Sequence, residues 1–179
     1  MKKKIIFIIT FICSTATFAQ NESVLNGMNV GIGIPTEFYD LKAAGTNIHL
    51  GYDYAHPVSD KFSIGLYVSA GGGFLGSFHP YNEYDKFYSM FRFSAGLLCE
   101  IGDLDYKPYL FGISPCIGLG FVDMDLVLPV ELRFGRVFSN WYVMGELVYG
   151  ISMADETICI EPSIRIGYNF GPRKRSRKK

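Results

Sequence analysis

A strict alternation of apolar residues with small or polar residues runs through the chain after residue 27 and constrains its fold more than any other feature. The stretch 62–71 shows it best, with Phe62, Ile64, Leu66, Val68 and Ala70 on one face and Ser63, Gly65, Tyr67, Ser69 and Gly71 on the other. Successive side chains of a β-strand point to opposite faces, so this period predicts strands with one apolar face. Helical spacing does not occur in these stretches.

The connections between the alternating stretches differ in length in a regular way. The stretches are 28–34, 48–54, 62–71, 87–101, 109–121, 126–134, 141–151 and 158–170. The connections 35–46 and 72–85 are long, whereas 56–60, 102–105 and 137–140 are short turns. An antiparallel meander would gather the long connections at one end and the short turns, with both termini, at the other. We therefore predict an all-β, eight-stranded antiparallel up-and-down transmembrane β-barrel with a polar interior.

The composition of the polar face indicates which side of the barrel meets water. A soluble lipocalin-like barrel would enclose its apolar face and carry dense Lys and Glu outside. Here the polar face is mostly Gly, Ser and Asn with isolated charges, as in a crowded interior, and the apolar face is mostly Ile, Leu, Val and Phe. Aromatic residues near the strand ends are candidates for an interfacial girdle. They are Tyr52, Tyr54, Tyr109, Phe121, Trp141, Tyr149, Tyr168 and Phe170.

Charged residues on the polar face form a candidate interior lattice. An arginine that faces lipid near the midplane costs roughly 2 to 4 kcal/mol, so the strand arginines should point inward. The members are Arg92, Glu100, Glu131, Arg133, Glu146, Glu161 and Arg165. Counting from the turn 137–140 places Glu131 opposite Glu146 with Arg133 diagonal to it, and counting from the last loop brings Arg165 near Glu146. With Asp53, carboxylates outnumber arginines, so some should be protonated or hydrated.

No motif assembles catalytic, metal-binding or cofactor-binding chemistry. Gly71, Gly73 and Gly76 spell GxGxxG after a strand, but no helical pattern follows, so they predict a flexible loop rather than a dinucleotide site. His49 and Asp53 share a strand face at roughly 13 Å, too far for an Asp-His relay. No His or Cys spacing suits a metal ion. A proton or ion path along the charged face stays open as an alternative, although an eight-stranded barrel is about wide enough only for its own side chains.

Both ends of the chain differ from the strands. Residues 1–19 have a basic start, an apolar run and a small-x-small site, which predicts a signal peptide for Sec export that is cleaved after Ala19. We assign 20–26 to a short N-terminal segment, 27–170 to the barrel domain and 171–179 to a basic tail. The tail holds six of the 17 Lys and Arg residues. It is either a solvated disordered end or a contact for anionic headgroups.

The cysteine count argues against complete disulfide pairing, and the net charge argues against nucleic-acid binding. Three cysteines follow the signal peptide, Cys99, Cys116 and Cys159, and an odd number cannot pair completely, so we interpret them as small packing residues. The 17 Lys and Arg balance 17 Asp and Glu, which leaves no global electrostatic case for nucleic acid.

Three features resemble a known family. The cleavage site Thr17-Phe18-Ala19, the eight alternating stretches and the closing stretch Arg165-Ile166-Gly167-Tyr168-Asn169-Phe170 are similar to the small outer-membrane β-barrel proteins of Gram-negative bacteria, especially the "porin family" or "outer membrane protein β-barrel domain" chains of the Bacteroidetes. The resemblance implies a place in the cell outer membrane, with outer-membrane lipids and the barrel-assembly machinery as partners. It also implies that this machinery reads Gly167, Tyr168 and Phe170 as an insertion signal.

The resemblance specifies architecture rather than activity. We therefore expect a non-enzymatic structural or surface-interaction role in the cell envelope, without a cofactor, in which the connections 35–46 and 72–85 contact an extracellular partner. The alternatives are a lipid-modifying enzyme of the outer membrane, a narrow channel and a soluble lipocalin-like carrier.

Overall fold

The computed structural model describes residues 25–38, 43–77, 87–104, 107–114, 118–122, 125–152 and 158–171. They form ten strand segments: β1 (Leu25–Gly33), β2 (Thr36–Phe38), β3 (Ala43–Ser59), β4 (Phe62–Ser77), β5 (Phe87–Ile101), β6 (Tyr109–Ser114), β7 (Gly118–Val122), β8 (Asp125–Phe138), β9 (Trp141–Ser152) and β10 (Ile158–Asn169). Among these described residues, no helix is long and apolar enough to cross a membrane.

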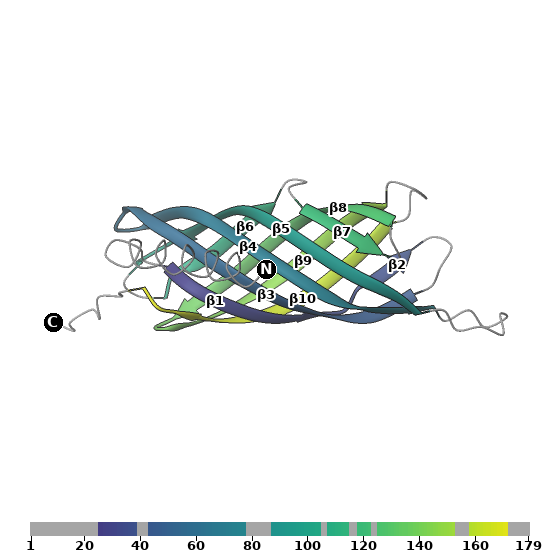
Figure 1. Ribbon diagram of the computed structural model, residues 1–179. Helices are drawn as coiled ribbons and strands as arrows, with labels where there is room; N and C mark the ends of the chain where they lie inside the picture. The colour runs from purple at the N-terminus through teal and green to yellow at the C-terminus, as the bar shows by residue number, and fades with distance from the viewer. Residues whose placement is uncertain are drawn as a thin grey trace, which may run out of the picture.

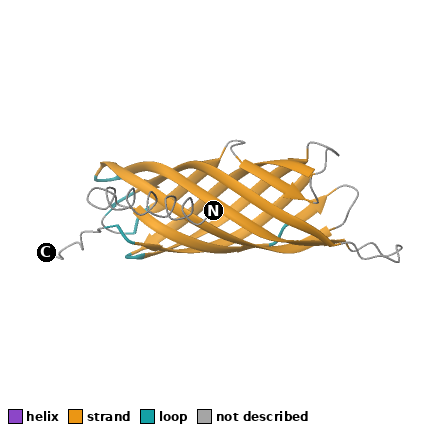
Figure 2. Ribbon diagram, in the orientation of Figure 1, coloured by secondary structure: helices purple, strands orange, loops and turns teal. Residues whose placement is uncertain are grey.

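The sheet closes on itself because β1 pairs with both β10 and β3. β2 follows β1 after a break at Ile34 and Pro35 and has the same two neighbours, and β6 and β7 both lie between β5 and β8. Counting each of these pairs as one interrupted strand confirms the predicted eight-stranded, all-antiparallel meander. Figure 1 shows the tilted strands wound around a single axis, and Figure 2 shows that strands make up nearly the whole wall.

Both ends of the barrel wall lie beside the short turns. The Phe170 amide donates to the Asn26 carbonyl, and the Asn169 amide donates to the carbonyl of Asn140 in the β8–β9 turn. The β3–β4 and β5–β6 turns also contact each other, since the Gly102 amide donates to the Lys61 carbonyl. The first strand begins at Leu25, two residues before the start expected from the alternation.

Several strands extend beyond the predicted limits. β3 continues to Ser59, so the expected turn at 56–60 shrinks to Asp60 and Lys61. β4 continues to Ser77, so the interpretation of the GxGxxG glycines as a flexible loop is wrong. Their backbones pair with β3 on one side and β5 on the other, and this hydrogen bonding persists where the side-chain alternation fades. The predicted long connections therefore reduce to 39–42 and 78–86, which lie outside the described residues.

The β8–β9 turn sets the register in the middle of the barrel. Phe138 pairs with Trp141 across the two residues Ser139 and Asn140, and Ser139 adopts the left-handed conformation with φ of 58°. This register places Arg133 directly opposite Glu146 and Glu131 opposite Val148. The expectation that Glu131 faces Glu146 is therefore wrong by two residues, because the turn is shorter than the four-residue connection from which we counted.

Candidate functional site

The charged side chains of the strands are enclosed in the barrel. Arg92 on β5, Arg133 on β8 and Arg165 on β10 are each at most 3% exposed, and the five inward carboxylates Asp53, Glu100, Glu131, Glu146 and Glu161 are at most 4% exposed. Alternation explains this placement, because each charged residue lies between residues that face outward. We call these eight residues, together with His49, the interior lattice.

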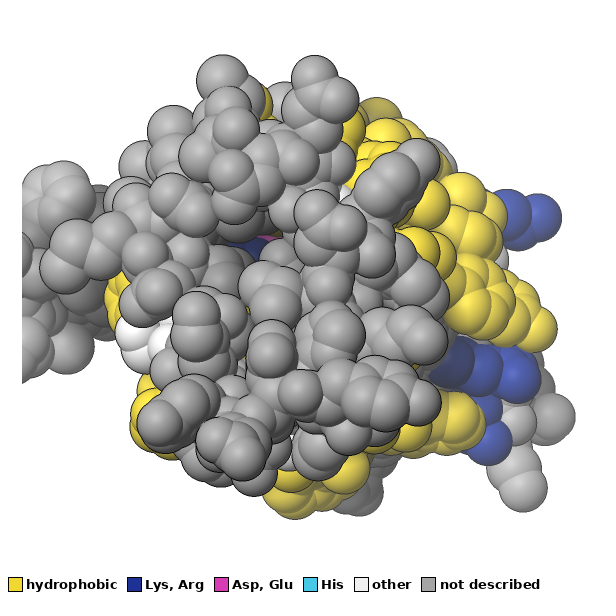
Figure 3. Space-filling model, turned by 90° about the vertical axis from the view of Figure 1, so that its right-hand side faces the viewer, with side chains coloured by type: hydrophobic (Ala, Val, Ile, Leu, Met, Phe, Trp, Pro, Cys, Tyr) yellow, Lys and Arg dark blue, Asp and Glu magenta, His cyan; other side chains and the backbone are white. Residues whose placement is uncertain are grey.

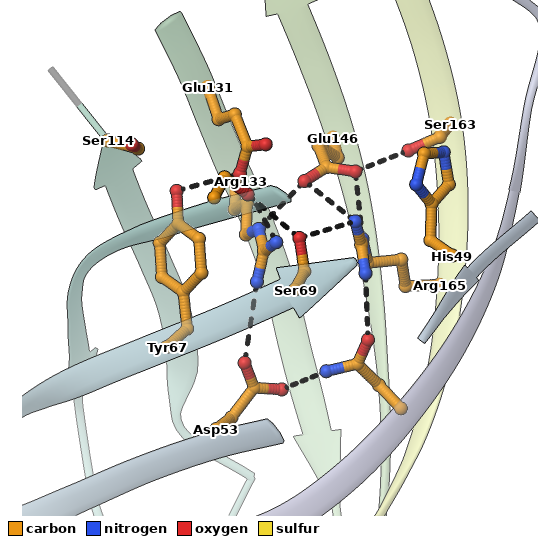
Figure 4. A network of polar contacts seen from close by, with 12 residues as sticks. His49, Asp53, Tyr67, Ser69, Ser114, Glu131, Arg133, Glu146, Ser163 and Arg165 are labelled. Carbon is orange, nitrogen blue, oxygen red and sulfur yellow. Dashed lines mark hydrogen bonds and ion pairs between the residues drawn. The ribbon is translucent and has the colours of Figure 1, made fainter. Parts of the chain in front are cut away.

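Glu146 on β9 is the centre of the interior lattice, as Figure 4 shows. Its Oε1 atom accepts from Arg133 Nε at 2.9 Å, and its Oε2 atom accepts from Arg165 Nε at 2.8 Å and from Ser163 Oγ at 2.8 Å. Arg92 Nη2 adds a longer contact at 3.4 Å. Three guanidinium groups therefore surround one enclosed carboxylate.

Arg133 connects the centre to a second polar cluster closer to the short turns. Its Nη1 atom lies 3.4 Å from Asp53 Oδ1, and its guanidinium carbon lies 3.5 Å from the centre of the Tyr67 ring. Asp53 Oδ2 also accepts from Asn29 Nδ2 and from the Tyr142 hydroxyl, each at 2.6 Å. Asp53 is therefore partnered within the described structure rather than merely hydrated.

His49 and Glu161 form a third cluster on the long-loop side of the lattice. His49 Nε2 bonds to Glu161 Oε1, and Arg92 Nη2 donates to His49 Nδ1 at 3.2 Å. Glu161 Oε2 accepts from Arg92 Nη1 at 3.1 Å and from Asn47 Nδ2 at 3.2 Å. A guanidinium nitrogen can only donate, so Nδ1 is the acceptor in its contact with Arg92, and Nε2 is the ring nitrogen that faces Glu161. Sequence reasoning compared His49 only with Asp53 and missed its partner 112 residues away.

Glycines opposite the large interior side chains make room for them. A Cβ atom added to Gly33 would lie 2.1 Å from Glu161 Oε1, one on Gly71 would lie 2.3 Å from His49 Nδ1, and one on Gly31 would lie 2.5 Å from the Arg165 Cγ atom. Gly27 and Gly167 leave comparable room for the Tyr142 ring, and Gly96 leaves room for Tyr67. The glycine-rich polar face is thus the complement of the interior lattice.

An apolar cluster fills the barrel between the lattice and the short turns. We call it the apolar seal, and its members, each at most 1% exposed, are Leu25, Ala55, Tyr67, Leu98, Leu110, Val137, Tyr142 and Met144. Tyr67 and Tyr142 join the two layers, since their hydroxyl groups donate to Glu131 and Asp53 of the lattice. Unlike the other carboxylates of the interior lattice, Glu100 lies in the layer of the apolar seal, opposite Leu110, and it accepts from the Ser63 hydroxyl at 2.9 Å.

The outward face forms an apolar belt. Met28, Val30, Ile32, Leu50, Leu66, Phe93, Leu132, Phe134, Leu147, Ile164 and Ile166 are each about half exposed or more. Of the girdle candidates, Tyr109, Trp141, Tyr149 and Phe170 are exposed, Tyr52, Tyr54 and Tyr168 are partly exposed, and the Phe121 side chain lies outside the described residues. Trp141, Tyr168 and Phe170 stack edge to face beside the β8–β9 turn.

The described residues offer no second kind of chemistry. In these parts of the chain, no group of three or more His, Cys, Asp or Glu residues could hold a metal ion. The GxGxxG glycines lie within a strand and cannot wrap a phosphate. Within the described residues, neither Cys99 nor Cys159 is part of a disulfide. Cys116, the signal peptide, His79 and residues 172–179 lie outside the described structure.

The fold is shared with solved bacterial surface proteins, although no protein-family model matches the chain and no curated protein matches its sequence. Ail, the attachment invasion locus protein of Yersinia pestis, solved with the heparin analogue sucrose octasulfate, is 14% identical and superposes with a TM-score of 0.59 over 83% of this chain and 99% of its own. Another structure of Ail gives 0.52 at 14% identity, over 81% of this chain and 97% of Ail. Neisserial surface protein A gives 0.54 at 11% identity, over 81% of this chain and 97% of its own. At these identities the likeness establishes a common fold.

Proposed function

We propose that this chain is an integral protein of the bacterial outer membrane, with a non-enzymatic structural or surface-interaction role in the cell envelope. The observation that carries the proposal is the polarity of the barrel, which encloses three arginines and five carboxylates and presents Ile, Leu, Val and Phe outward. An apolar outer surface of this kind is stable in lipid. A closed barrel also leaves no strand edge unpaired in the hydrocarbon. The fold shared with Ail and Neisserial surface protein A supports the same location.

Export and insertion follow from the same proposal. The signal peptide at 1–19 would direct the chain through the Sec system, and the barrel-assembly machinery would read Gly167, Tyr168 and Phe170 on the closing strand. Phe170 is 52% exposed on the outer surface and contacts Tyr168, and its backbone amide binds the first strand through Asn26. These contacts place the three residues at the seam where the barrel closes. A porin-type family of the Bacteroidetes remains the proposed affiliation.

Structural observations disfavour each alternative. A soluble carrier would need an apolar interior, whereas the middle of this barrel is charged. In a lipid-modifying enzyme a histidine with a free nitrogen would act as the base, and His49 does not supply one, because both of its ring nitrogens are engaged by Glu161 and Arg92. A narrow channel would need an open polar path, and the apolar seal lies across it.

The sequence segments at the long-loop end are rich in acidic residues, which argues against a receptor for sulfated polyanions. The segments around the strand ends there contain eight acidic residues and two lysines: Glu37, Asp40, Glu83, Asp85, Asp123, Asp125, Asp155 and Glu156 against Lys42 and Lys86. An acidic surface repels a polyanion such as the heparin analogue bound by Ail. We therefore propose an extracellular partner of a different chemical class, contacted through 35–46 and 72–85.

Labelling of intact cells tests the location and the orientation together. A tag inserted in the segment 78–86 should be labelled by an impermeant reagent on intact cells, whereas a tag after Lys179 should be labelled only once the outer membrane is broken. The folded protein should also run faster than the heated protein on a denaturing gel, as closed barrels do. Labelling of the terminal tag alone on intact cells would reverse the orientation.

Heparin chromatography tests the charge argument. The purified barrel in neutral detergent should pass through immobilised heparin at physiological ionic strength, and a variant with lysine in place of Glu83, Asp85, Asp123 and Asp155 should be retained. Retention of the unmodified protein would show that acidic loop charge does not determine ligand class.

A further inference from the structure

One basic side chain lies on the outer surface of the barrel rather than in its interior. Arg136 on β8 is exposed and lies in the same outward row as Leu132, Phe134 and Phe138. The guanidinium carbon of Arg136 lies 4.9 Å from the centre of the Tyr109 ring on the neighbouring strand. Within the described structure, no carboxylate lies at ion-pair distance from Arg136. An arginine in an apolar row is costly unless a partner compensates its charge.

The depth of Arg136 matches the boundary between hydrocarbon and headgroups. It precedes the turn at Ser139 by three residues, or about 10 Å along the strand. With the usual strand tilt this is about 8 Å along the bilayer normal, comparable with the headgroup layer on one side of a bilayer. Tyr109 is 43% exposed and stacks on Phe134, with ring centres 6.2 Å apart. The guanidinium is thus held on an aromatic platform at headgroup depth.

A second exposed basic residue precedes this platform in the chain. Lys107 comes two residues before Tyr109, and the Pro108 carbonyl accepts from the Val137 amide, which extends the β6–β8 ladder toward the turn. Figure 3 shows dark-blue Lys and Arg side chains at separate places along the right-hand edge, with yellow side chains of the apolar belt between them. Among the described residues, the basic side chains outside the lumen are Lys61, Lys107 and Arg136.

We propose that Arg136 and Tyr109 form a binding site for the phosphodiester headgroup of an anionic phospholipid in the leaflet at the short-turn end. A guanidinium presents a planar fork that binds phosphate oxygens bidentately, and stacking on Tyr109 leaves that fork free. The outward row of Phe134 and Leu132 continues into the hydrocarbon and can line the acyl chains. The inference rests on the proposed membrane location and adds to it a lipid class and a site.

Lipid retention tests the site directly. The mature protein is reconstituted in phosphatidylcholine vesicles containing a minor fraction of phosphatidylglycerol, extracted gently, and examined by native mass spectrometry for bound lipid. The unmodified barrel should retain phosphatidylglycerol in preference to phosphatidylcholine. Arg136→Gln should lower this preference about fivefold, since one basic group near an anionic surface contributes about that factor. Arg136→Lys should keep part of the preference, because the charge remains and the fork is lost.

Three controls keep the test decisive. Lys61→Gln removes an equal charge at the same end of the barrel and should leave the preference unchanged. Removal of residues 173–179 should also leave it unchanged. Tyr109→Leu should lower it and provides the comparison if Arg136→Gln does not fold. Equal loss in Lys61→Gln, loss only on removal of the tail, or no loss in Arg136→Gln would each overturn the proposal. None of these outcomes depends on cell-surface labelling, so a failure of the proposed location would be distinguishable.

Discussion

Glu146 satisfies three arginines at once, so its removal should be more damaging than the loss of any one of its bonds. Glu146→Leu leaves Arg133 and Arg165 without their shortest carboxylate contact. We expect a loss of about 3 to 5 kcal/mol in the free energy of unfolding, the usual result of breaking a buried ion pair from one side. Urea unfolding in lipid or detergent, followed by the fluorescence of the single tryptophan, Trp141, would measure it.

A double-mutant cycle separates a lattice from independently hydrated charges. Glu146 is the carboxylate to which the described structure pairs Arg165, so Glu146→Leu combined with Arg165→Met should cost clearly less than the sum of the two single changes. Ser163→Ala removes only a neutral donor to Glu146 and should cost about 1 kcal/mol. Strictly additive costs would mean that each charge is hydrated separately in a wet lumen.

Two adjacent glycines offer a matched test of interior packing. A Cβ atom at Gly71 would lie 2.3 Å from His49 Nδ1, whereas one at the outward Gly72 would have its nearest neighbour at 3.8 Å. Gly71→Ala should therefore displace the His49 ring from Glu161 and Arg92 and cost about 1 to 3 kcal/mol in stability. Gly72→Ala should cost nothing measurable in the same unfolding assay. Similar stabilities for the two variants would show that the interior is loosely filled.

The alternation of side chains along a strand predicts which residues face inward, but not which of these inward residues contact each other. His49, Asp53, Glu146 and Arg165 all lie at inward positions that alternation identifies. The contact between His49 on β3 and Glu161 on β10 passes over the one strand that lies between them, where Gly33 leaves room for Glu161, and the stagger of the closed barrel brings those positions together. Tyr142 shares the parity of Glu146 and could have been predicted to face inward.

At the scale of one strand, β8 tests the assignment of the two faces. Leu132 is 51% exposed on the apolar belt, and its neighbour Arg133 is enclosed. Leu132→Arg should lower the free energy of folding into a bilayer by about 2 to 4 kcal/mol if this position lies near the midplane. Leu132→Ala is the control for lost packing, and Ser163→Arg is the comparison on the inward face, where no lipid penalty applies. A cost for Leu132→Arg no greater than that for Leu132→Ala would contradict the face assignment.

Strand number and direction could be predicted from the sequence, but strand length could not. Alternation is enforced only where one face meets lipid and the other meets the lumen. Beyond the apolar belt, β3 and β4 keep pairing as far as Ala43 and Ser77 although their side chains no longer alternate strictly. The register across the β8–β9 turn could not be predicted from the sequence either, because it depends on a two-residue turn that composition does not specify.

At the scale of the whole molecule, charge is distributed unevenly along the barrel axis. In the sequence, the connecting segments of the long-loop end hold more acidic residues than lysines. In the described structure, the lumen encloses five carboxylates with three arginines, and the basic residues outside the lumen lie at the short-turn end. Lys61 and Lys107 belong to the turns, and Arg136 lies near one. The sequence and the described residues thus assign opposite net charge to the segments at the two ends of the barrel.

Two barriers lie in series along the lumen, and this arrangement makes a definite prediction for ion flow. The interior lattice fills the middle of the barrel with paired side chains, and the apolar seal, with Leu25, Leu98 and Leu110 at most 1% exposed, excludes water closer to the short turns. An ion would have to break buried pairs and then shed its hydration, so the protein should give no current steps in a planar bilayer. The double variant Leu98→Ser, Leu110→Ser opens only the apolar seal, so it should also give no current steps. Steps in the unmodified protein, or in this variant at unchanged stability, would show that the charged layer is a path rather than a plug.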